Sequence, residues 1–204
     1  MIVVAAGQAT RFGRPKQYEL LGGRRVLDWS IAAARSVADG LVVVVPAGAE
    51  DAPEAAADAT VGGGATRSAS VRAGLAAVPP EATIVLVHDA ARPLASPALF
   101  GRVVDAVCAG ADAVVPAVAV ADTLRRRDGG TVDRDELVAV QTPQGFRARA
   151  LRDAHATREE ATDDAALVER QGGSVVLVEG EPGNRKITDP SDLAAAEGMI
   201  DRCS

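Results

Sequence analysis

The chain has 204 residues, of which 48% are hydrophobic and 25% are charged, so it is long enough to bury the core of a globular domain without disulfides. A net charge of −6 and an aromatic content of only 2% exclude a globally basic nucleic-acid surface and disfavour a base-stacking one. The 2 cysteines are too few for a disulfide framework or a zinc site, and no apolar run approaches the roughly 18 residues of a membrane span.

Short apolar, β-branched runs alternate with helical patterns along the chain. Nearly continuous apolar runs predict buried strands at residues 1–5, 41–46, 59–62, 84–88, 113–118 and 175–179. Apolar residues that fall near one face predict helices at 26–37, 66–78, 96–109, 147–157 and 163–171, and the alanine-rich stretch 52–59 is interpreted as a further short helix. The alternation predicts one α/β domain over residues 1–204, with a mostly parallel sheet covered by helices on both sides.

Two expectations follow from this layout. Ligands of such sheets bind beyond the carboxyl ends of the strands, so the loops that follow the strands are the place to look for chemistry. The first strand begins directly at Met1 with no basic leader before it, which predicts a cytoplasmic protein without a signal peptide, and we expect no nucleic-acid or membrane partner.

One stretch interrupts the alternation. Residues 119–140 include a polar run from Asp122 to Arg134, in which Asp128-Gly129-Gly130 stands between flanks that carry Thr and Val, a pattern typical of a β-hairpin. A polar hairpin inserted into an α/β domain packs poorly by itself. We therefore predict a β-arm that is either a mobile flap or a contact with a partner subunit.

A glycine-bearing loop with Gly7, Arg11 and Lys16 follows the first predicted strand. Backbone N–H groups of such a loop approach phosphate oxygens, and basic side chains add charge. The chain has 22 lysine and arginine residues, yet lysine occurs only at 16 and 186, each time in a loop that contains glycine. Lysine supplies a compact, movable point charge where arginine supplies a planar fork. A tight turn with solvated basic side chains would give the same pattern, because the loop is neither a Walker loop nor a full Gly-x-Gly-x-x-Gly motif.

Residues 88–93, His-Asp-Ala-Ala-Arg-Pro, end the fourth predicted strand. Asp89 there is well placed to hold Mg²⁺ beside phosphates, and Arg92 to bind a phosphate bidentately, although a turn residue and its salt bridge are the ordinary alternative. His88 is interpreted as a buried, hydrogen-bonded histidine, His155 as a surface residue, and Cys108 as a small core residue.

A second glycine turn, Gly62-Gly63-Gly64, leads into the helix predicted at 66–78. Gly64 would let backbone groups read the edge of a base and Ser70 would add a hydroxyl, unless this is only a capped helix start. Thr162 is predicted to cap the helix that follows it. No Ser-His-Asp order, His-Glu-x-x-His motif or Cys/His cluster is present, which disfavours covalent hydrolysis and zinc chemistry.

Taken in chain order, these segments closely resemble the 2-C-methyl-D-erythritol 4-phosphate cytidylyltransferase family. The resemblance runs essentially from end to end. It rests on Ala5-Ala6-Gly7, Arg11, Pro15-Lys16-Gln17-Tyr18, Ser70-Val71 with Gly74-Leu75, residues 88–93, Asp122-Thr123, Asp133-Arg134, Thr142-Pro143-Gln144, Thr162-Asp163 and residues 184–188.

The resemblance implies a Rossmann-like, three-layer domain, a homodimer joined by the β-arm, and Mg²⁺ or another divalent cation. CTP and a polyol phosphate would be the ligands: the phosphate of 2-C-methyl-D-erythritol 4-phosphate attacks the α-phosphorus of CTP and releases pyrophosphate. Such transfer demands positioning and charge neutralisation, and the attacking group is already an anion, so the absence of an obvious catalytic histidine fits.

The resemblance also implies a role for each matching residue. Arg11 and Lys16 would stabilise charge on the pentacoordinate phosphorus, while Lys186 and Arg134 would position the attacking phosphate, with Arg134 reaching over from the arm of the second subunit. Asp89 would lie by the metal, the nucleotide and the sugar hydroxyls. The nucleotide would also contact Ala5, Ala6, Gly7, Gly64 and Ser70. The acceptor site would be completed by Arg92, Thr123, Thr142, Thr162 and Thr188.

Three alternatives remain open at this point. A related cytidylyltransferase for ribitol 5-phosphate shares the first loop and Pro-Lys-Gln. A dinucleotide-binding oxidoreductase would place an acid about 20 residues after Gly7, where Asp28 stands, but Asp28 opens a predicted helix and the third glycine is missing. A non-catalytic nucleotide-binding module would need neither lysine for turnover.

Overall fold

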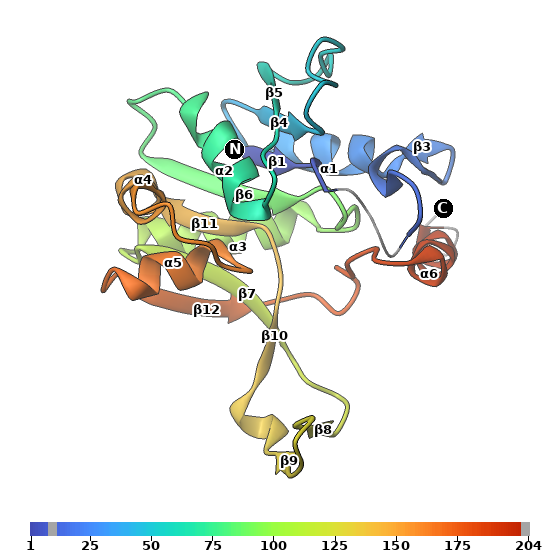
Figure 1. Ribbon diagram of the computed structural model, residues 1–204, viewed down its shortest axis with the longest axis vertical. Helices are drawn as coiled ribbons and strands as arrows, with labels where there is room; N and C mark the ends of the chain where they lie inside the picture. The colour runs from blue at the N-terminus through green and yellow to red at the C-terminus, as the bar shows by residue number, and fades with distance from the viewer. Residues whose placement is uncertain (8–11, 201–204) are drawn as a thin grey trace.

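One mixed sheet lies at the centre of the protein (Figure 1). In residues 1–7 and 12–200, which the computed structural model describes, the sheet has eight strands. Their order is β10 (Val138–Val140), β7 (Ala113–Ala119), β11 (Gln144–Arg147), β6 (Ile84–Asp89), β1 (Ile2–Val4), β4 (Val42–Val45) and β5 (Ala59–Gly62), and β12 (Val175–Glu179) pairs with β7. Most neighbours are parallel, whereas β11 runs antiparallel between β6 and β7 and β10 runs antiparallel to β7.

Helices cover both faces of the sheet, which gives three layers. On one face, apolar side chains of the sheet pack against α2 (Arg67–Ala76), α4 (Ala148–Ala156) and α5 (Asp164–Arg170). On the other face they pack against α1 (Val26–Arg35) and α3 (Pro97–Cys108). The valine-rich strand β4 is buried along its whole length because both of its faces are covered. The predicted α/β class, with a mostly parallel sheet between helical layers, is confirmed.

The parallel register brings several strand ends to one place. Val4 of β1 lies opposite both Val44 of β4 and Asp89 of β6. The residues that follow these strands therefore meet at one edge of the sheet, where a ligand is expected in this kind of fold.

Segments that are far apart in the sequence meet beside that edge. A small apolar cluster joins the start of α1 to α6 (Pro190–Ile200) and to the ladder of β2 (Leu20–Leu21) and β3 (Arg24–Arg25). Its buried members are Phe12, Leu21, Val26, Ile187 and Ala196. The cluster places the turn η1 (Lys16–Tyr18) near the segment before α6, so the two lysine-bearing segments become neighbours.

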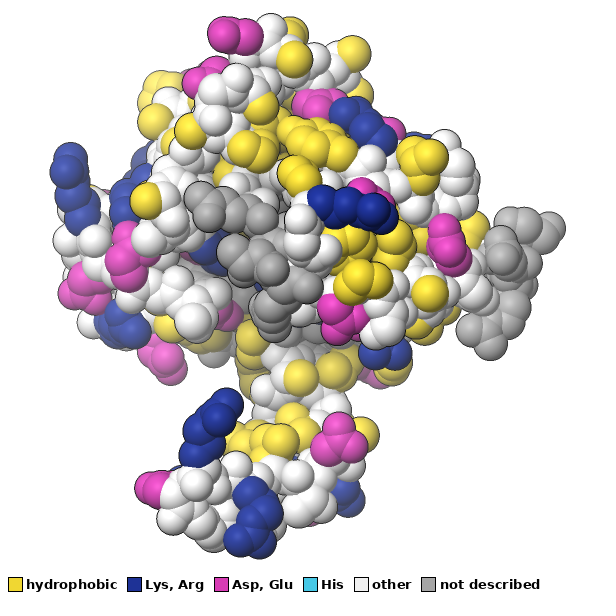
Figure 2. Space-filling view, turned by 45° about the vertical axis from the view of Figure 1, so that its right-hand side comes forward, with side chains coloured by type: hydrophobic (Ala, Val, Ile, Leu, Met, Phe, Trp, Pro, Cys, Tyr) yellow, Lys and Arg dark blue, Asp and Glu magenta, His cyan; other side chains and the backbone are white. Residues whose placement is uncertain are grey.

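The interrupting stretch forms a β-arm that projects from the body of the domain (Figure 1). The hairpin consists of β8 (Leu124–Arg125) and β9 (Thr131–Val132), followed by the turn η2 (Arg134–Glu136). Gly129 and Gly130 have φ angles of 114° and 80°, which favour glycine and confirm the predicted turn. Figure 2 shows apolar side chains exposed on the arm next to basic ones. The exposed apolar residues there include Leu124, Leu137, Val138 and Val140.

Each predicted strand, and each helix predicted from its periodicity, is present with ends that shift by at most two residues. The predicted burial of residues 175–179 is wrong, because Val176 and Leu177 of β12 are exposed. The short helix predicted at 52–59 is wrong: the stretch is made of turns, and β5 starts at Ala59. Two ion pairs attach these turns to the two ends of α1: Glu54 pairs with Arg25 at 2.7 Å, and Asp58 pairs with Arg35 at 2.7 Å. Strand β11 has only four residues and lacks an apolar run, which is why the sequence did not indicate it.

Three residue-level predictions are also corrected. His155 is buried, and its Nε2 lies 3.0 Å from the buried carboxylate of Asp164. Cys108, at the end of α3, is exposed and is no core residue. Helix α5 is capped by Asp163, whose side chain accepts a hydrogen bond from the N–H of Ala166, and Thr162 lies one residue too early. Within the described part of the chain, every helix is too short or too polar to cross a membrane.

Candidate active site

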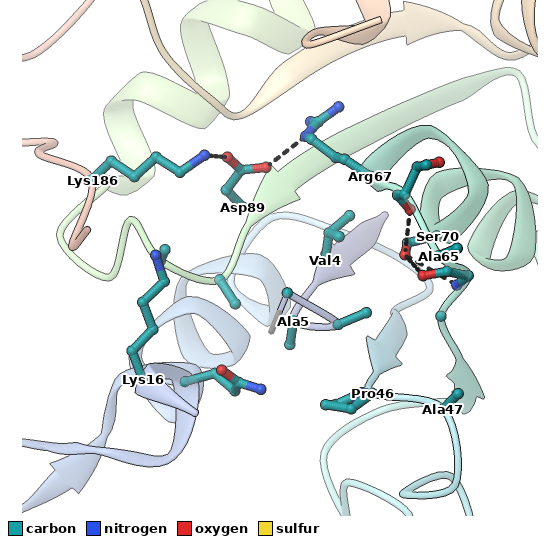
Figure 3. Close-up of a pocket in the computed structure, with 18 residues that line it drawn as sticks. Val4, Ala5, Lys16, Pro46, Ala47, Ala65, Arg67, Ser70, Asp89 and Lys186 are labelled. Carbon is teal, nitrogen blue, oxygen red and sulfur yellow. Dashed lines mark hydrogen bonds and ion pairs between the residues drawn. The ribbon is translucent and has the colours of Figure 1, made fainter. Parts of the chain in front are cut away.

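A cavity of about 510 Å³ opens at the carboxyl ends of β1, β4, β5 and β6 (Figure 3). It contains eight of the predicted site residues: Ala5, Ala6, Gly7, Lys16, Gly64, Ser70, Asp89 and Lys186. It is also lined by residues that the sequence analysis did not assign to the site: Val4, Gln17, Pro46, Ala47, Gly63, Ala65, Thr66, Arg67, Ala90 and Ala91.

One wall of the cavity is built from very small residues. A Cβ atom added to Gly63 would lie 2.3 Å from the Cβ of Ala6, and one added to Gly64 would lie 2.5 Å from the Cβ of Ala69. Neither contact is possible, so both positions require glycine. The Gly64 N–H donates to the Ser70 hydroxyl at 3.2 Å, which ties this wall to α2. The result is a slot with exposed backbone groups, suited to a flat heterocycle.

The two lysines of the chain line this same cavity. Lys16 comes from η1 and Lys186 from the segment before α6, and Figure 3 shows both side chains on the same side of the cavity. The Lys16 ammonium donates to the Ile187 carbonyl at 2.6 Å, one residue beyond Lys186. Two point charges from opposite ends of the sequence thus face one space, as a bound polyphosphate requires.

Asp89 ends β6 and is held from three directions. Its Oδ2 accepts from the Lys186 ammonium at 2.6 Å and its Oδ1 from Arg67 Nε at 3.1 Å, while its own N–H donates to the Thr142 hydroxyl at 3.0 Å. Burial alone would raise the pKa of this carboxyl, but the charges of Arg67 and Lys186 outweigh burial and hold its pKa well below the ordinary value. Asp89 is therefore a fixed carboxylate.

The charges of the cavity suit an anion that brings a cation with it. Among the described lining residues, Lys16, Arg67 and Lys186 are cationic and Asp89 alone is anionic. Residues 1–7 and 12–200 contain no group of three or more His, Cys, Asp or Glu that would hold a metal by itself. One carboxylate next to a phosphate-binding space nevertheless fits Mg²⁺, which takes one or two carboxylates and completes its shell with phosphate oxygens and water.

Three of the predicted acceptor-site residues lie outside the cavity wall but close to it in the fold. Arg92 does not pair with Asp89: its guanidinium donates to the carbonyls of Asn184 at 2.7 Å and Val140 at 3.2 Å. Thr142 is buried behind Asp89, in the bend between β10 and β11. Thr188 follows Lys186 and its hydroxyl donates to the Lys186 carbonyl at 3.2 Å. These residues surround the Asp89–Lys186 pair from the side opposite the glycine wall.

Three of the remaining predicted residues, Thr123, Arg134 and Thr162, do not line the cavity of their own chain. Thr123 and Arg134 lie on the exposed arm, where the Arg134 guanidinium donates to the Ala121 carbonyl at 2.6 Å. Thr162 is exposed before α5. Arg11 lies outside the described residues.

His88 is buried in the middle of the fold, as predicted. Its Nδ1 lies 3.2 Å from the Thr142 hydroxyl and its Nε2 lies 3.1 Å from the Arg92 carbonyl. Burial lowers the pKa of His88 to about 4, so the ring is neutral near pH 7. Its ring connects Thr142 to the loop of Arg92, and we assign it no acid–base role in catalysis.

Arg67 is the lining residue that sequence reasoning missed with the largest consequence. The sequence analysis considered this segment a capped helix start, and Thr66 does cap α2 by accepting a hydrogen bond from the Ala69 N–H. One signal was available: Arg67 places a cation in the first turn of a helix, where the helix dipole disfavours it. Such a position needs compensating anions, and Asp89 and Asp164 supply them.

Comparisons with known proteins agree with this geometry. Residues 1–202 match the family model described as "IspD: 2-C-methyl-D-erythritol 4-phosphate cytidylyltransferase". The 2-C-methyl-D-erythritol 4-phosphate cytidylyltransferase of Nocardia farcinica is 48% identical over 98% of this chain and 93% of its own length. A bifunctional IspD/IspF enzyme of Anaeromyxobacter dehalogenans is 44% identical over 98% of this chain, which corresponds to 56% of that longer protein.

The fold leads to the same family. The crystal structure of the 2-C-methyl-D-erythritol 4-phosphate cytidylyltransferase of Thermus thermophilus superimposes with a TM-score of 0.86 at 42% identity, over 98% of each chain. Sequence, fold and the contents of the cavity agree over essentially the whole chain. This protein belongs to the 2-C-methyl-D-erythritol 4-phosphate cytidylyltransferase family.

Proposed function

We propose that the protein transfers the CMP group of CTP to the phosphate of 2-C-methyl-D-erythritol 4-phosphate in isoprenoid precursor biosynthesis. An oxygen of the acceptor phosphate attacks the α-phosphorus of CTP, a new P–O bond forms, and the bond to the β-phosphate breaks as pyrophosphate leaves. The products are the cytidine diphosphate ester of methylerythritol and pyrophosphate. Family membership gives the reaction, and the observation that carries it to this chain is the convergence of Lys16 and Lys186 on the cavity of Asp89.

The roles of the individual residues follow from where charge develops. The leaving pyrophosphate and the five-coordinate phosphorus gain negative charge, and Lys16, with Arg11 from the preceding loop, would stabilise it. Lys186 would hold the attacking phosphate from the other side. The wall of Ala6, Gly63 and Gly64 would take the cytosine, because its small side chains leave the cavity open to a base.

A divalent cation is part of the proposal. Asp89 would be its protein ligand, and Mg²⁺ would reduce the repulsion between the triphosphate and the acceptor phosphate when bound. Both oxygens of Asp89 are already paired with cations, so the carboxylate is held ready with a defined orientation.

We further propose that the protein works in the cytoplasm as a homodimer joined through the β-arm. The arm exposes Leu124, Leu137, Val138 and Val140, and it carries Arg134 away from the cavity of its own chain. Burying these side chains against a second subunit would bring Arg134 and Thr123 to that subunit's acceptor site. An exposed apolar hairpin is a common form of subunit contact.

The test is a pyrophosphate-release assay with CTP and Mg²⁺ and two acceptors in parallel. We expect release with 2-C-methyl-D-erythritol 4-phosphate and far less with ribitol 5-phosphate. A preference for ribitol 5-phosphate would overturn the acceptor assignment, and no release with either acceptor would overturn the proposed reaction. Omission of the metal by chelation should abolish release and test the cation separately.

A further inference from the structure

A chain of ion pairs leads from the cavity into the interior between α2, α4 and α5. Lys186 pairs with Asp89 at 2.6 Å, Asp89 with Arg67 at 3.1 Å, and Arg67 with Asp164 at 2.6 Å. Asp164 in turn pairs with His155 at 3.0 Å. Lys186, Asp89 and Arg67 line the cavity, whereas Asp164 and His155 are buried and do not line it.

The geometry fixes how Arg67 is used. Its Nε donates to one carboxylate and its terminal nitrogen to another, so the planar guanidinium is locked between Asp89 and Asp164. The Asp164 side chain is 0% exposed and the Arg67 side chain 22% exposed, so water competes little with either bond. A lysine at this position would place one point charge and could not span both carboxylates in the same way.

The geometry also fixes how His155 is used. Its Nε2 lies 3.0 Å from Oδ1 of Asp164 and donates this bond, because a carboxylate oxygen only accepts. Its Nδ1 is buried without a hydrogen-bond partner among the described residues. Asp164 is thus held by His155 through one oxygen and by Arg67 through the other.

From this arrangement we propose that Arg67 is a positioning residue for the transfer reaction and that Asp164, held by His155, acts through it. Arg67 occupies Oδ1 of Asp89, so that Oδ2 is directed at Lys186, the residue proposed to hold the attacking phosphate. This inference rests on the proposed function. It adds one requirement to that function: the attacking phosphate is placed correctly only while Arg67 remains paired with Asp164, which lies outside the cavity.

The sharpest variant is Asp164→Asn, which has the same shape, keeps an acceptor oxygen and removes the charge. We expect kcat to fall about tenfold, as for other residues that orient a functional group from behind, while the KM for CTP stays within about threefold. The base and triphosphate contacts do not involve Asp164, so the loss should appear in turnover. A purely structural role would instead lower the melting temperature and leave the kcat of the folded enzyme unchanged.

A double-mutant cycle separates action through Arg67 from a direct effect. Arg67→Met is made alone and together with Asp164→Asn, and kcat is measured below the unfolding temperature. We expect Asp164→Asn to cost nothing further in the Arg67→Met background. A full additional tenfold loss there would overturn the relay. Should Arg67→Met fail to fold, Arg67→Lys takes its place, and we expect Asp164→Asn to cost less than about threefold in that background.

Arg72→Met is the matched control. Arg72 lies on the same helix and pairs with Glu160 at 2.7 Å, but it lies away from the cavity. Its kcat should equal that of the wild type. If the wild type itself releases no pyrophosphate, the proposed function fails; if the wild type is active and Asp164→Asn keeps its kcat, only the role of Arg67 and Asp164 fails.

Discussion

At the scale of single residues, the two lysines show how this chain assigns its cations. Arginine fills the remaining 20 basic positions, and many of these pair on the surface, as Arg35 does with Asp58. Both lysines line the cavity. A compact ammonium can follow a phosphate whose geometry changes during transfer, while a guanidinium prefers a fixed carboxylate or phosphate face.

Lys16→Ala should lower kcat by about 100-fold or more, because a preorganised charge that acts on the transition state is lost. Lys16→Arg should also impair turnover, since the fork does not replace the point charge. Steady-state pyrophosphate release measures both. Arg14→Ala is the control in the same loop, where Arg14 pairs with Glu19 and is 66% exposed, and it should keep its rate. Equal rates for all three variants would remove Lys16 from the mechanism.

Thr142→Val should destabilise the fold by about 1–3 kcal/mol, because it leaves the Asp89 N–H without its buried acceptor. Urea unfolding followed by circular dichroism measures the difference. Thr162→Val is the exposed counterpart and should change stability by less than about 0.5 kcal/mol. If the two variants unfold alike, Thr142 does not support Asp89 in the way described.

His88 predicts how stability depends on pH. Its pKa is about 4 in the folded protein and 6.5 ordinarily, so the unfolded chain binds the proton more tightly. The stabilising effect of the neutral ring is complete above about pH 6.5 and is lost as the pH falls toward 4. Unfolding free energies measured across this window should fall more steeply for the wild type than for His88→Asn. Parallel curves would show that His88 does not titrate as described. The pKa of Asp89 is lowered from 3.8, so its stabilising contribution is complete throughout this window and is lost only at lower pH.

At the scale of elements, strands with continuous apolar runs could be predicted from the sequence. Strand β11, which has no such run and pairs between two strands from other parts of the chain, could not. Strand β4 is a run of valines. Such a run predicts a strand that is buried on both faces, and β4 is buried along its whole length. Strand β11 is Gln-Gly-Phe-Arg, and its place between β6 and β7 depends on pairing partners far along the chain. In the same way, the burial of His155 depends on Asp164, which local periodicity does not report.

The arm carries a prediction that distinguishes one subunit from two. If Arg134 serves the cavity of the second subunit, a mixture of Arg134→Ala and Lys186→Ala chains contains heterodimers with one intact cavity. Random mixing should then restore about a quarter of wild-type activity, although each variant alone is nearly inactive. Activity is measured after the chains are unfolded and refolded together. No recovery, with dimers confirmed by light scattering, would place Arg134 in its own chain's site or outside catalysis.

At the scale of the whole molecule, the net charge of −6 opposes the binding of a triphosphate, and the lining cations overcome it locally. Attraction between partly exposed charges weakens as salt is added. We expect the KM for CTP to rise several-fold between about 50 and 300 mM KCl at saturating Mg²⁺, with a smaller change in kcat. Initial rates at fixed pH measure this. A KM independent of salt would show that the lining cations do not drive capture.

The bond between the Lys16 ammonium and the Ile187 carbonyl spans almost the entire chain. The ribosome synthesises Lys16 171 residues before Ile187, and β1, β4, β5 and β6 all lie between Met1 and Asp89. Four strands that surround the cavity are therefore made well before the segment that carries Lys186. A cavity that holds both lysines is complete only after that segment has been synthesised and has docked beside η1.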